Sequence, residues 1–253
     1  MPVRALLNLV SRRPALRHQV PPGRRVYAIG DIHGRSDLLE ALLASIEADR
    51  ARRPAADTLL IFLGDLVDRG PDSRGVVERL MTVRGGPVPT RFLMGNHEEV
   101  FLRAVGGDVR ALRFLIRIGG RATIMSYGIG ADEYASLDYE ALAGRLRELV
   151  PQAHVDFLSS FEEWIEVGDY LFVHAGIRPG VDLDAQRPSD LRWIRDDFLD
   201  CRDDFGKLVV HGHSITDDVD VRPNRIGIDT GAFESGQLTA IGLEGAERWF
   251  LST

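Results

Sequence analysis

Three short polar segments, each directly after an apolar run, limit the possible folds of this chain more than any other feature. They are GDIHGR at residues 30–35, GDLVDRG at 64–70 and GNHE at 95–98. The apolar runs before them are short and bounded by polar residues, as buried strands are. These runs cover 26–29, 59–63 and 92–94. The pattern therefore predicts three strands, each ending in a loop that carries Asp, His or Asn side chains.

Further apolar runs extend this pattern along the chain. Short runs typical of strands recur at 170–173, 208–210, 219–222, 226–229, 238–243 and 248–251. Helical spacing separates the early strands, at 38–46 after a candidate N-cap at Ser36 and at 76–81 after another at Ser73. Alternating strands and helices predict an α/β fold, in which ligands gather beyond the carboxyl ends of the strands.

The chain between about 101 and 165 shows helical patterns only, interrupted by the glycine pair at 119–120. Such an insertion would form a helical cap beside the strand ends, where it either covers the core or shapes a substrate groove. Residues 1–25 carry six arginines and no acidic residue. We therefore expect a basic N-terminal extension over 1–24 and one folded domain over 25–253.

Composition argues against several other classes of protein. The 253 residues carry a formal net charge of −7, whereas general nucleic-acid binding needs a concentrated basic surface. Cys201 is the single cysteine, so no internal disulfide can form, and we expect a reducing, cytoplasmic setting. No apolar run is long enough to cross a bilayer, so we expect no stable membrane insertion.

The polar side chains at the strand ends form a candidate metal-binding set. Asp31 and His33 flank one residue of a turn, and on their own they would indicate only a surface turn. The other candidates are Asp65, Asn96, His174 and His213. A mixed shell of carboxylate, amide and imidazole suits Mn, Fe or Zn. Two such ions about 3.5–4 Å apart can clamp a phosphate and supply hydroxide at neutral pH.

Together these motifs resemble the phosphoprotein phosphatase branch of the calcineurin-like metallophosphoesterases, which includes bacterial-type serine/threonine protein phosphatases. The resemblance runs from Gly30 to about Gly231. It implies an α/β fold, with a β-sandwich of mixed sheets flanked by helices and a helical cap insertion. Residues 25–253 would then form one metallophosphoesterase domain.

The same resemblance implies a dinuclear metal centre, with Mn²⁺ expected and Fe or Zn as alternatives. Asp65 would bridge the two ions. Asp31 and His33 would bind one of them, and Asn96, His174 and His213 are the ligands implied for the other.

It also implies the groups that act on the phosphate. Asp68 would hold His97, the general acid that protonates the leaving oxygen. Chemistry alone leaves open that His97 binds metal and Asp68 is a surface charge. Arg69 and Arg195 would bind the phosphate oxygens, together with Asn96.

Three assignments stay open at this stage. Arg192 is close enough in sequence to compete with Arg195 as the second phosphate-binding arginine. His211 is either a partner of an adjacent ligand or an ordinary buried polar group. Residues 119–128, which include Thr123, resemble a stretch of bacterial members and either line the substrate groove or cap a helix.

The expected function is that of a metal-dependent phosphomonoester hydrolase acting on phosphoproteins or phosphopeptides, and on small aryl phosphates in vitro. A protein serine/threonine phosphatase is the first interpretation, because Asp68 precedes Arg69 in the second motif. The first alternative is a hydrolase of diadenosine tetraphosphate or other nucleotides on the same scaffold. The second is a catalytically silent metal-binding scaffold.

Overall fold

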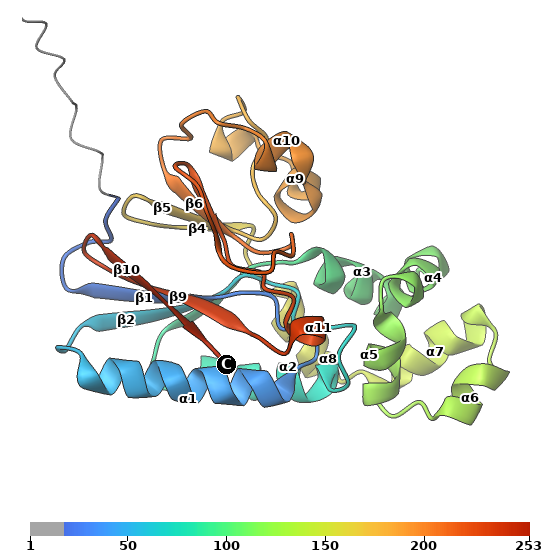
Figure 1. Ribbon diagram of the computed structural model, residues 1–253. Helices are drawn as coiled ribbons and strands as arrows, with labels where there is room; N and C mark the ends of the chain where they lie inside the picture. The colour runs from blue at the N-terminus through green and yellow to red at the C-terminus, as the bar shows by residue number, and fades with distance from the viewer. Residues whose placement is uncertain (1–17) are drawn as a thin grey trace, which may run out of the picture.

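Two five-stranded sheets pack face to face, and helices cover their outer faces (Figure 1). This computed structural model describes residues 18–253. The first sheet has the order β10 (Glu247–Ser252), β9 (Thr239–Glu244), β1 (Arg24–Ile29), β2 (Asp57–Phe62) and β3 (Thr90–Phe92). The second sheet has the order β4 (Trp164–Val167), β5 (Tyr170–Val173), β6 (Leu208–His211), β8 (Arg225–Gly227) and β7 (Asp220–Val221).

Each sheet combines three parallel strands with antiparallel pairings. In the first sheet β1, β2 and β3 are parallel, β9 pairs antiparallel with β1, and β10 pairs antiparallel with β9. In the second sheet β5, β6 and β8 are parallel, while β4 and β7 are antiparallel at the edges. The carboxyl ends of the parallel strands within each sheet therefore lie at one edge. The expected sandwich of mixed sheets is confirmed.

Alternation along the strands builds the apolar layers. On β1, Val26 and Ala28 face the second sheet, whereas Tyr27 and Ile29 face the helices. Phe172 of β5 enters the layer between the sheets from the opposite side. Each fully buried Val, Ile, Leu or Phe side chain contributes about 1.5–3 kcal/mol to the stability of the fold. This layer holds the two sheets together, so the loops after β1, β2, β5 and β6 meet.

Helices close the outer faces of the sandwich. Along the first sheet lie α1 (Ser36–Arg52) and α2 (Ser73–Arg84) (Figure 1). Over the second lie α9 (Pro188–Trp193) and α10 (Asp196–Leu199), which pack Leu191 and Phe198 against the strands. The short 3₁₀ helix η1 (Leu183–Ala185) precedes α9, and α11 (Ala232–Ser235) precedes β9.

The N-cap predictions at Ser36 and Ser73 are wrong by one residue. The N-cap of α1 is Arg35, which makes no side-chain capping bond. The N-cap of α2 is Asp72, whose carboxylate accepts a hydrogen bond from Gly75 N at 2.9 Å. The Ser73 hydroxyl is used elsewhere, because it accepts from the backbone N–H of Asp68.

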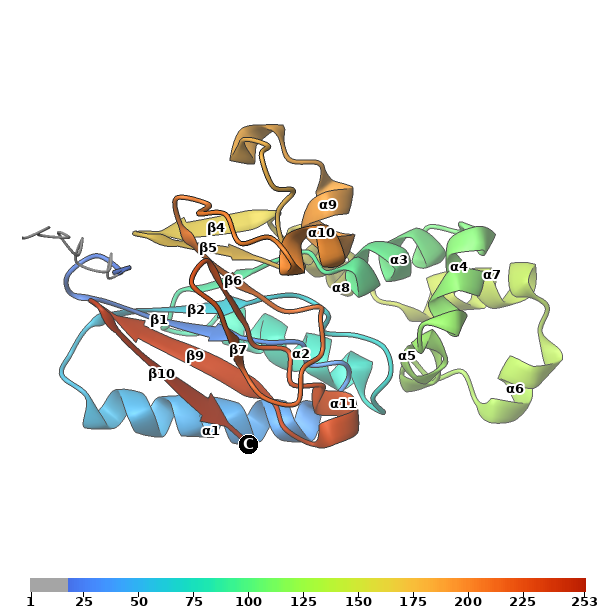
Figure 2. The same ribbon diagram turned by 45° about the horizontal axis from the view of Figure 1, so that its top comes forward.

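Six helices fill the chain between β3 and β4, and those from α4 to α7 project to one side of the sandwich (Figures 1 and 2). They are α3 (Asn96–Val105), α4 (Val109–Arg117), α5 (Gly120–Ser126), α6 (Ala131–Ser136), α7 (Tyr139–Leu149) and α8 (Gln152–Ser159). Helix therefore occupies 96–159, where the sequence predicts a cap at 101–165. The strand β4 was not predicted, since a run with only Ile165 and Val167 buried is too short to reveal its period.

Residues just before β1 already pack against the sandwich. Val20 is buried between the sheets, and its N–H donates to Gly245 O at 3.0 Å. Gln19 N donates to the Asp169 carboxylate. The folded part thus begins earlier than the expected boundary at 24/25, and residues 1–17 of the expected extension lie outside the described residues. Within the described part of the chain, no helix is both long and apolar enough to cross a membrane.

Candidate active site

The loops after β1, β2 and β6 hold predicted site residues in strained backbone conformations. Between residues 18 and 253, five residues other than glycine have positive φ, and all lie in these loops. They are His33, Asp65, Asp68, Arg69 and His213, with φ of 46°, 49°, 72°, 69° and 64°. Such conformations cost roughly 1–3 kcal/mol each and cluster where function requires a fixed side-chain direction.

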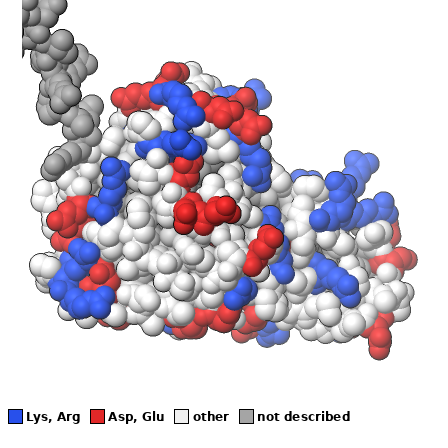
Figure 3. All heavy atoms as spheres, viewed as in Figure 1, with Lys and Arg blue, Asp and Glu red and all other residues white. Residues whose placement is uncertain are grey.

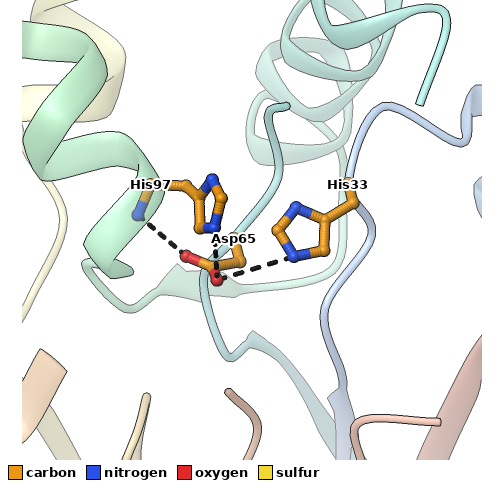
Figure 4. Close-up of side chains that lie close together, drawn as sticks. All are labelled: His33, Asp65 and His97. Atoms are coloured by element: carbon orange, nitrogen blue, oxygen red, sulfur yellow. Dashed lines mark hydrogen bonds and ion pairs between the residues drawn. The ribbon is translucent and has the colours of Figure 1, made fainter. Parts of the chain in front are cut away.

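Asp65 lies at the centre of two groups of possible metal ligands. One group is His33, Asp65 and His97, and the other is Asp65, His174 and His213. His33 Nε2 lies 3.6 Å from Asp65 Oδ2, and His174 Nε2 lies 3.4 Å from Asp65 Oδ1 (Figure 4 shows the first group). A carboxylate shared by two ligand groups has the geometry needed to bridge two cations.

Several buried ligand atoms in this cluster lack a hydrogen-bond partner among the described residues. They are Asp31 Oδ1, His33 Nε2 and His213 Nε2. Buried polar atoms are otherwise almost always paired, so these three fit a bound cation. Asp31 uses its other oxygen to accept from His213 N at 3.0 Å, which joins the loops after β1 and β6.

Hydrogen bonds from the second ring nitrogen aim the histidines at the cluster. His33 Nδ1 lies 2.8 Å from Val67 O, and His174 Nδ1 lies 2.8 Å from Leu63 O. A carbonyl acceptor requires a proton on Nδ1, which leaves the Nε2 lone pair directed at Asp65. Burial lowers the pKa of His33 to about 3 and also lowers that of His174. Both imidazoles are therefore neutral near pH 7, in the form that binds metal.

Asn96 lies at the start of α3, on the same side as His174. Its Oδ1 is 3.0 Å from His174 Nε2, and the residue is buried. The amide oxygen and the imidazole nitrogen thus point into one small volume. The structure therefore brings together all six residues that the sequence nominated as metal ligands.

His97 and Asp68 form a closely bonded pair beside this cluster. His97 Nδ1 lies 2.7 Å from Asp68 Oδ2, and both side chains are buried. Burial by itself lowers the pKa of His97, but the Asp65 and Asp68 carboxylates outweigh burial and raise the pKa above its usual value. An imidazolium held in this way can donate a proton from Nε2. His97 Nε2 also lies 3.8 Å from Asp65 Oδ2, which is why geometry alone includes it in a ligand group.

The structure distinguishes Arg195 from Arg192, the two candidates for the second phosphate-binding arginine. Arg69 Nη2 lies 3.3 Å from His97 Nε2, and its guanidinium lies over the Phe233 ring. Arg195 Nη1 donates to Ser214 Oγ at 3.4 Å, and Ser214 is the residue that follows His213 in the sequence. Arg192 instead pairs with Glu163, and its Nη1 lies 3.3 Å from Glu99 Oε2. Arg192 is thus held by two carboxylates, whereas Arg195 lies next to the cluster.

His211 makes its contacts away from the predicted ligands. Its Nδ1 lies 3.0 Å from Gly212 O, its Nε2 lies 3.3 Å from Arg225 Nη1, and its ring packs on Phe198. Burial lowers the pKa of His211 to about 4. Of the two interpretations of this residue, the contacts favour the buried polar group.

Sequence reasoning missed Glu98, which organises the loop that carries Asp65. Its fully buried carboxylate accepts from the backbone N–H groups of Asp65 and Leu66 at 2.8 Å, and of Gly95 at 3.2 Å. Burial raises the pKa of Glu98 to about 7, with the nearby Asp65 charge adding to the effect. The sequence did offer a signal for this role, because a glutamate in the first turn of a helix often accepts from backbone N–H groups at the helix start.

Asp229 was also missed, although it follows the apolar run 226–228 as the other ligands follow theirs. It is buried, and its Oδ1 accepts from Gly231 N at 3.0 Å. Burial raises the pKa of Asp229 to about 6, and Asp229 in turn helps to raise the pKa of the buried Asp31. A bound cation would relieve this repulsion between neighbouring carboxyl groups.

A two-sheet sandwich with a buried Asp, His and Asn cluster at its strand ends is the arrangement expected of a metal-dependent phosphoesterase. The family model of the calcineurin-like phosphoesterases matches residues 24–237. This chain therefore belongs to the calcineurin-like phosphoesterase family. Membership of this family does not identify the metal.

Two curated relatives are both symmetrical bis(5'-nucleosyl)-tetraphosphatases. The protein from Neisseria gonorrhoeae (strain NCCP11945) is 30% identical over 270 residues, which cover 87% of this chain and 93% of the relative. The protein from Acidovorax sp. (strain JS42) is 34% identical over 154 residues, covering 61% of this chain. That match spans only 44% of the length of the Acidovorax protein.

Solved structures support the fold. A protein described as a candidate diadenosine tetraphosphatase aligns with a TM-score of 0.62 and 22% identity, covering 93% of this chain and 97% of its own. A cold-active protein tyrosine phosphatase aligns with a TM-score of 0.57 and 20% identity, covering 95% and 84%. The expected family is thus confirmed as that of the calcineurin-like phosphoesterases. The protein serine/threonine phosphatase interpretation is not confirmed, because the named relatives favour the nucleotide alternative.

Proposed function

We propose that this chain hydrolyses bis(5'-nucleosyl) tetraphosphates to two nucleoside diphosphates, using two divalent cations. The observation that carries the proposal is the alignment with a symmetrical bis(5'-nucleosyl)-tetraphosphatase. That alignment covers 87% of this chain and 93% of the relative. Its match therefore extends well beyond the three strand-end motifs.

Asp31, His33 and the shared Asp65 would hold one cation, and Asp65, Asn96, His174 and His213 the other. The distances of 3.4 and 3.6 Å from Asp65 oxygens to His174 and His33 support this division. When bound, the two ions supply an activated water and neutralise charge on the reacting phosphate.

The remaining groups would act on the substrate itself. Arg69 and Arg195 lie beside His97 and His213, where they can bind nonbridging oxygens of the attacked phosphate. The oxygen of water bonds to phosphorus, and the bond from phosphorus to the central bridging oxygen breaks. His97, held by Asp68, donates its Nε2 proton to the departing nucleoside diphosphate.

Aromatic rings on both sides of the cluster support a nucleoside substrate. The half-buried Phe233 ring lies 5.5 Å from His33, and the half-buried Trp193 ring lies 6.4 Å from His213. Phe114 of α4 lies 5.8 Å from Trp193. Aromatic faces of this kind can stack on bases.

Positive charge on the cap supports a polyanionic substrate. Arg110, Arg113 and Arg117 are exposed on α4, and blue side chains gather over this helix at the right of Figure 3. An electropositive surface beside a binding site attracts anions such as a tetraphosphate.

The second candidate is hydrolysis of phosphoserine or phosphothreonine, and the His97–Asp68 pair favours it. The leaving alkoxide of such an ester is far more basic than a terminal phosphate oxygen, whose second pKa is about 6. A general acid therefore accelerates alkoxide departure more than departure of a nucleoside diphosphate.

A substrate panel tests the two candidates directly. The purified chain with Mn²⁺ would be given diadenosine tetraphosphate, a phosphoserine peptide and p-nitrophenyl phosphate, with Asp65→Asn as the control for contaminating activity. We expect ADP as the sole nucleotide product and a kcat/KM for the dinucleotide at least about tenfold above that for the peptide, a difference of 1.4 kcal/mol. A preference for the peptide would support the second candidate. Absence of turnover on all three substrates with two ions bound would support the silent scaffold.

A further inference from the structure

Beyond α3, residues 119–126 of the cap also contact the loop after β2 and the start of α2. Gly119 O accepts from Arg69 N at 3.1 Å, and Ser126 Oγ accepts from Arg74 N at 3.2 Å. Between these two contacts, Thr123 of α5 reaches Asp68. The segment is therefore bonded at Arg69 and Asp68 to the loop that carries the His97 partner, and at Arg74 to the first turn of α2.

Thr123 has an arrangement of hydrogen bonds that fixes its hydroxyl. The residue is fully buried, and its Oγ1 donates to Asp68 Oδ1 at 2.6 Å. Since a hydroxyl has one proton, the 2.8 Å contact with Ser73 Oγ must be a bond in which Ser73 donates. Asp68 N donates to Thr123 Oγ1 at 2.8 Å and to Ser73 Oγ at 3.0 Å. Both the carboxylate and the backbone of Asp68 are thus held.

Two glycines allow α5 to come this close. Gly119 has φ of 112°, and a Cβ there would lie 2.8 Å from Arg69 Cγ and 3.1 Å from Arg69 N. A Cβ on Gly120 would lie 2.8 Å from Leu115 O. A side chain at Gly119 would push α5 away from the loop that contains Asp68, and one at Gly120 would push α5 away from α4.

We infer that Thr123 is a positioning residue that sets the orientation of the His97–Asp68 pair from the helical cap. Asp68 Oδ1 is bonded to Thr123, so the carboxylate plane is fixed and Oδ2 faces His97 Nδ1 at 2.7 Å. Asp68 has φ of 72°, an unfavourable conformation for this residue that needs such support. The inference rests on the acid role of His97 in the proposed function.

The test compares Thr123→Val, which is nearly isosteric but lacks the hydroxyl, with Thr123→Ser, which keeps it. Thr82→Val is the matched control, because Thr82 is a helical threonine whose hydroxyl donates only to Glu78 O. The substrates are phenyl phosphate, with a basic leaving group, and p-nitrophenyl phosphate, with a weakly basic one. General acid catalysis is worth about 10²–10⁴-fold, so partial misorientation should cost about tenfold in kcat on phenyl phosphate.

The expected result is a leaving-group-dependent loss. Thr123→Val should lose less than about threefold on p-nitrophenyl phosphate, Thr123→Ser should recover most of the activity on phenyl phosphate, and Thr82→Val should change neither. Equal losses of Thr123→Val on both substrates, or no rescue by serine, would overturn the inference.

A His97→Asn arm separates the failure of this inference from failure of the acid role. If His97→Asn loses the same factor in kcat on both substrates, the acid role in the proposed function is wrong, and the inference is wrong with it. If His97→Asn is selective but Thr123→Val is not, only the inference is wrong. Should Thr123→Val fail to fold, Ser73→Ala removes the donor to Thr123 Oγ1. That variant must then show a smaller, equally selective loss, and a non-selective one would overturn the inference.

Discussion

At the scale of single residues, the site is organised around one carboxylate. Asp65 lies within 3.4–3.8 Å of three histidine nitrogens and accepts from His97 N at 3.0 Å. Burial raises the pKa of Asp65, but the surrounding histidines, His174 first, outweigh burial and lower it. Asp65 is therefore ionised at neutral pH, as the proposed bridging of two cations requires.

Asp65→Asn should remove most activity and at least one of the two metal ions. Loss of the bridging charge removes several kcal/mol of stabilisation, so kcat should fall by about 100-fold or more, further than in Arg69→Ala or Arg195→Ala. Metal content by elemental analysis and turnover of p-nitrophenyl phosphate check this. Asp57→Asn is the control, because Asp57 pairs only with Arg24 on the surface. Full metal content with unchanged turnover would contradict the bridging assignment.

The stability of the metal-free protein should fall in acid, partly because of His211. Burial lowers the pKa of His211 to about 4, while the unfolded chain has the ordinary value near 6.5. Below pH 6.5 the unfolded state therefore binds a proton that the folded state does not, so stability is lost as the pH falls to about 4. The loss is at most about 3 kcal/mol. Urea unfolding at pH 7.5 and 5 should show a weaker pH dependence in His211→Gln, and an unchanged dependence would refute the prediction.

At the scale of elements, the cap is connected to the site by the turn between α4 and α5. Gly119 is the N-cap of α5, has φ of 112°, and its carbonyl oxygen accepts from Arg69 N. The sequence placed a break at this glycine pair but left its role open between a groove lining and a helix cap. The contacts show that the turn joins the cap to the loop that carries Asp68 and Arg69.

Gly119→Ala and Gly144→Ala should change stability in opposite directions. Alanine at Gly119 would be strained and would place Cβ 2.8 Å from Arg69 Cγ, costing about 1–3 kcal/mol. Gly144 lies inside α7 with no atom near its Cβ position, so alanine there should stabilise the protein by about 0.5–1 kcal/mol. Denaturant unfolding measures both free energies. Equal effects of the two substitutions would contradict the assigned role of Gly119.

At the scale of the whole molecule, the two sheets meet so that loops from both enclose one cluster. Asp31 and Asp65 come from the first sheet, whereas His174 and His213 come from the second. The Asp31 bond to His213 N crosses between the sheets. Cation binding should therefore strengthen the contact between the two halves of the sandwich.

Metal removal should lower the Tm, and Mn²⁺ should restore it. A ligand that binds only the folded state at 100 times its Kd stabilises that state by about 2.7 kcal/mol. Thermal unfolding with chelator, and after added Mn²⁺, measures the shift, and Asp65→Asn should respond much less. Identical Tm values for the wild-type protein in both conditions would contradict a metal site built from both sheets.

The sequence alone predicted the strands with Asp, His or Asn at their ends and the helical insertion, because apolar runs and the polar residues after them are local features. The six candidate ligands as a set, and the two sheets, were implied by the family resemblance. It missed β4, and it placed the N-caps of α1 and α2 one residue late, since Asp72 competes locally with Ser73.

Only the tertiary structure decided which side chains support those ligands. Glu98 reaches Asp65, Thr123 reaches Asp68, and Asp229 lies beside Asp31, across 33, 55 and 198 residues of chain. It also separated Arg195 from Arg192, because only folding brings Glu163 and Glu99 to Arg192. The physical reason is that these contacts depend on how two sheets and a cap pack in space, which periodicity along the chain does not encode.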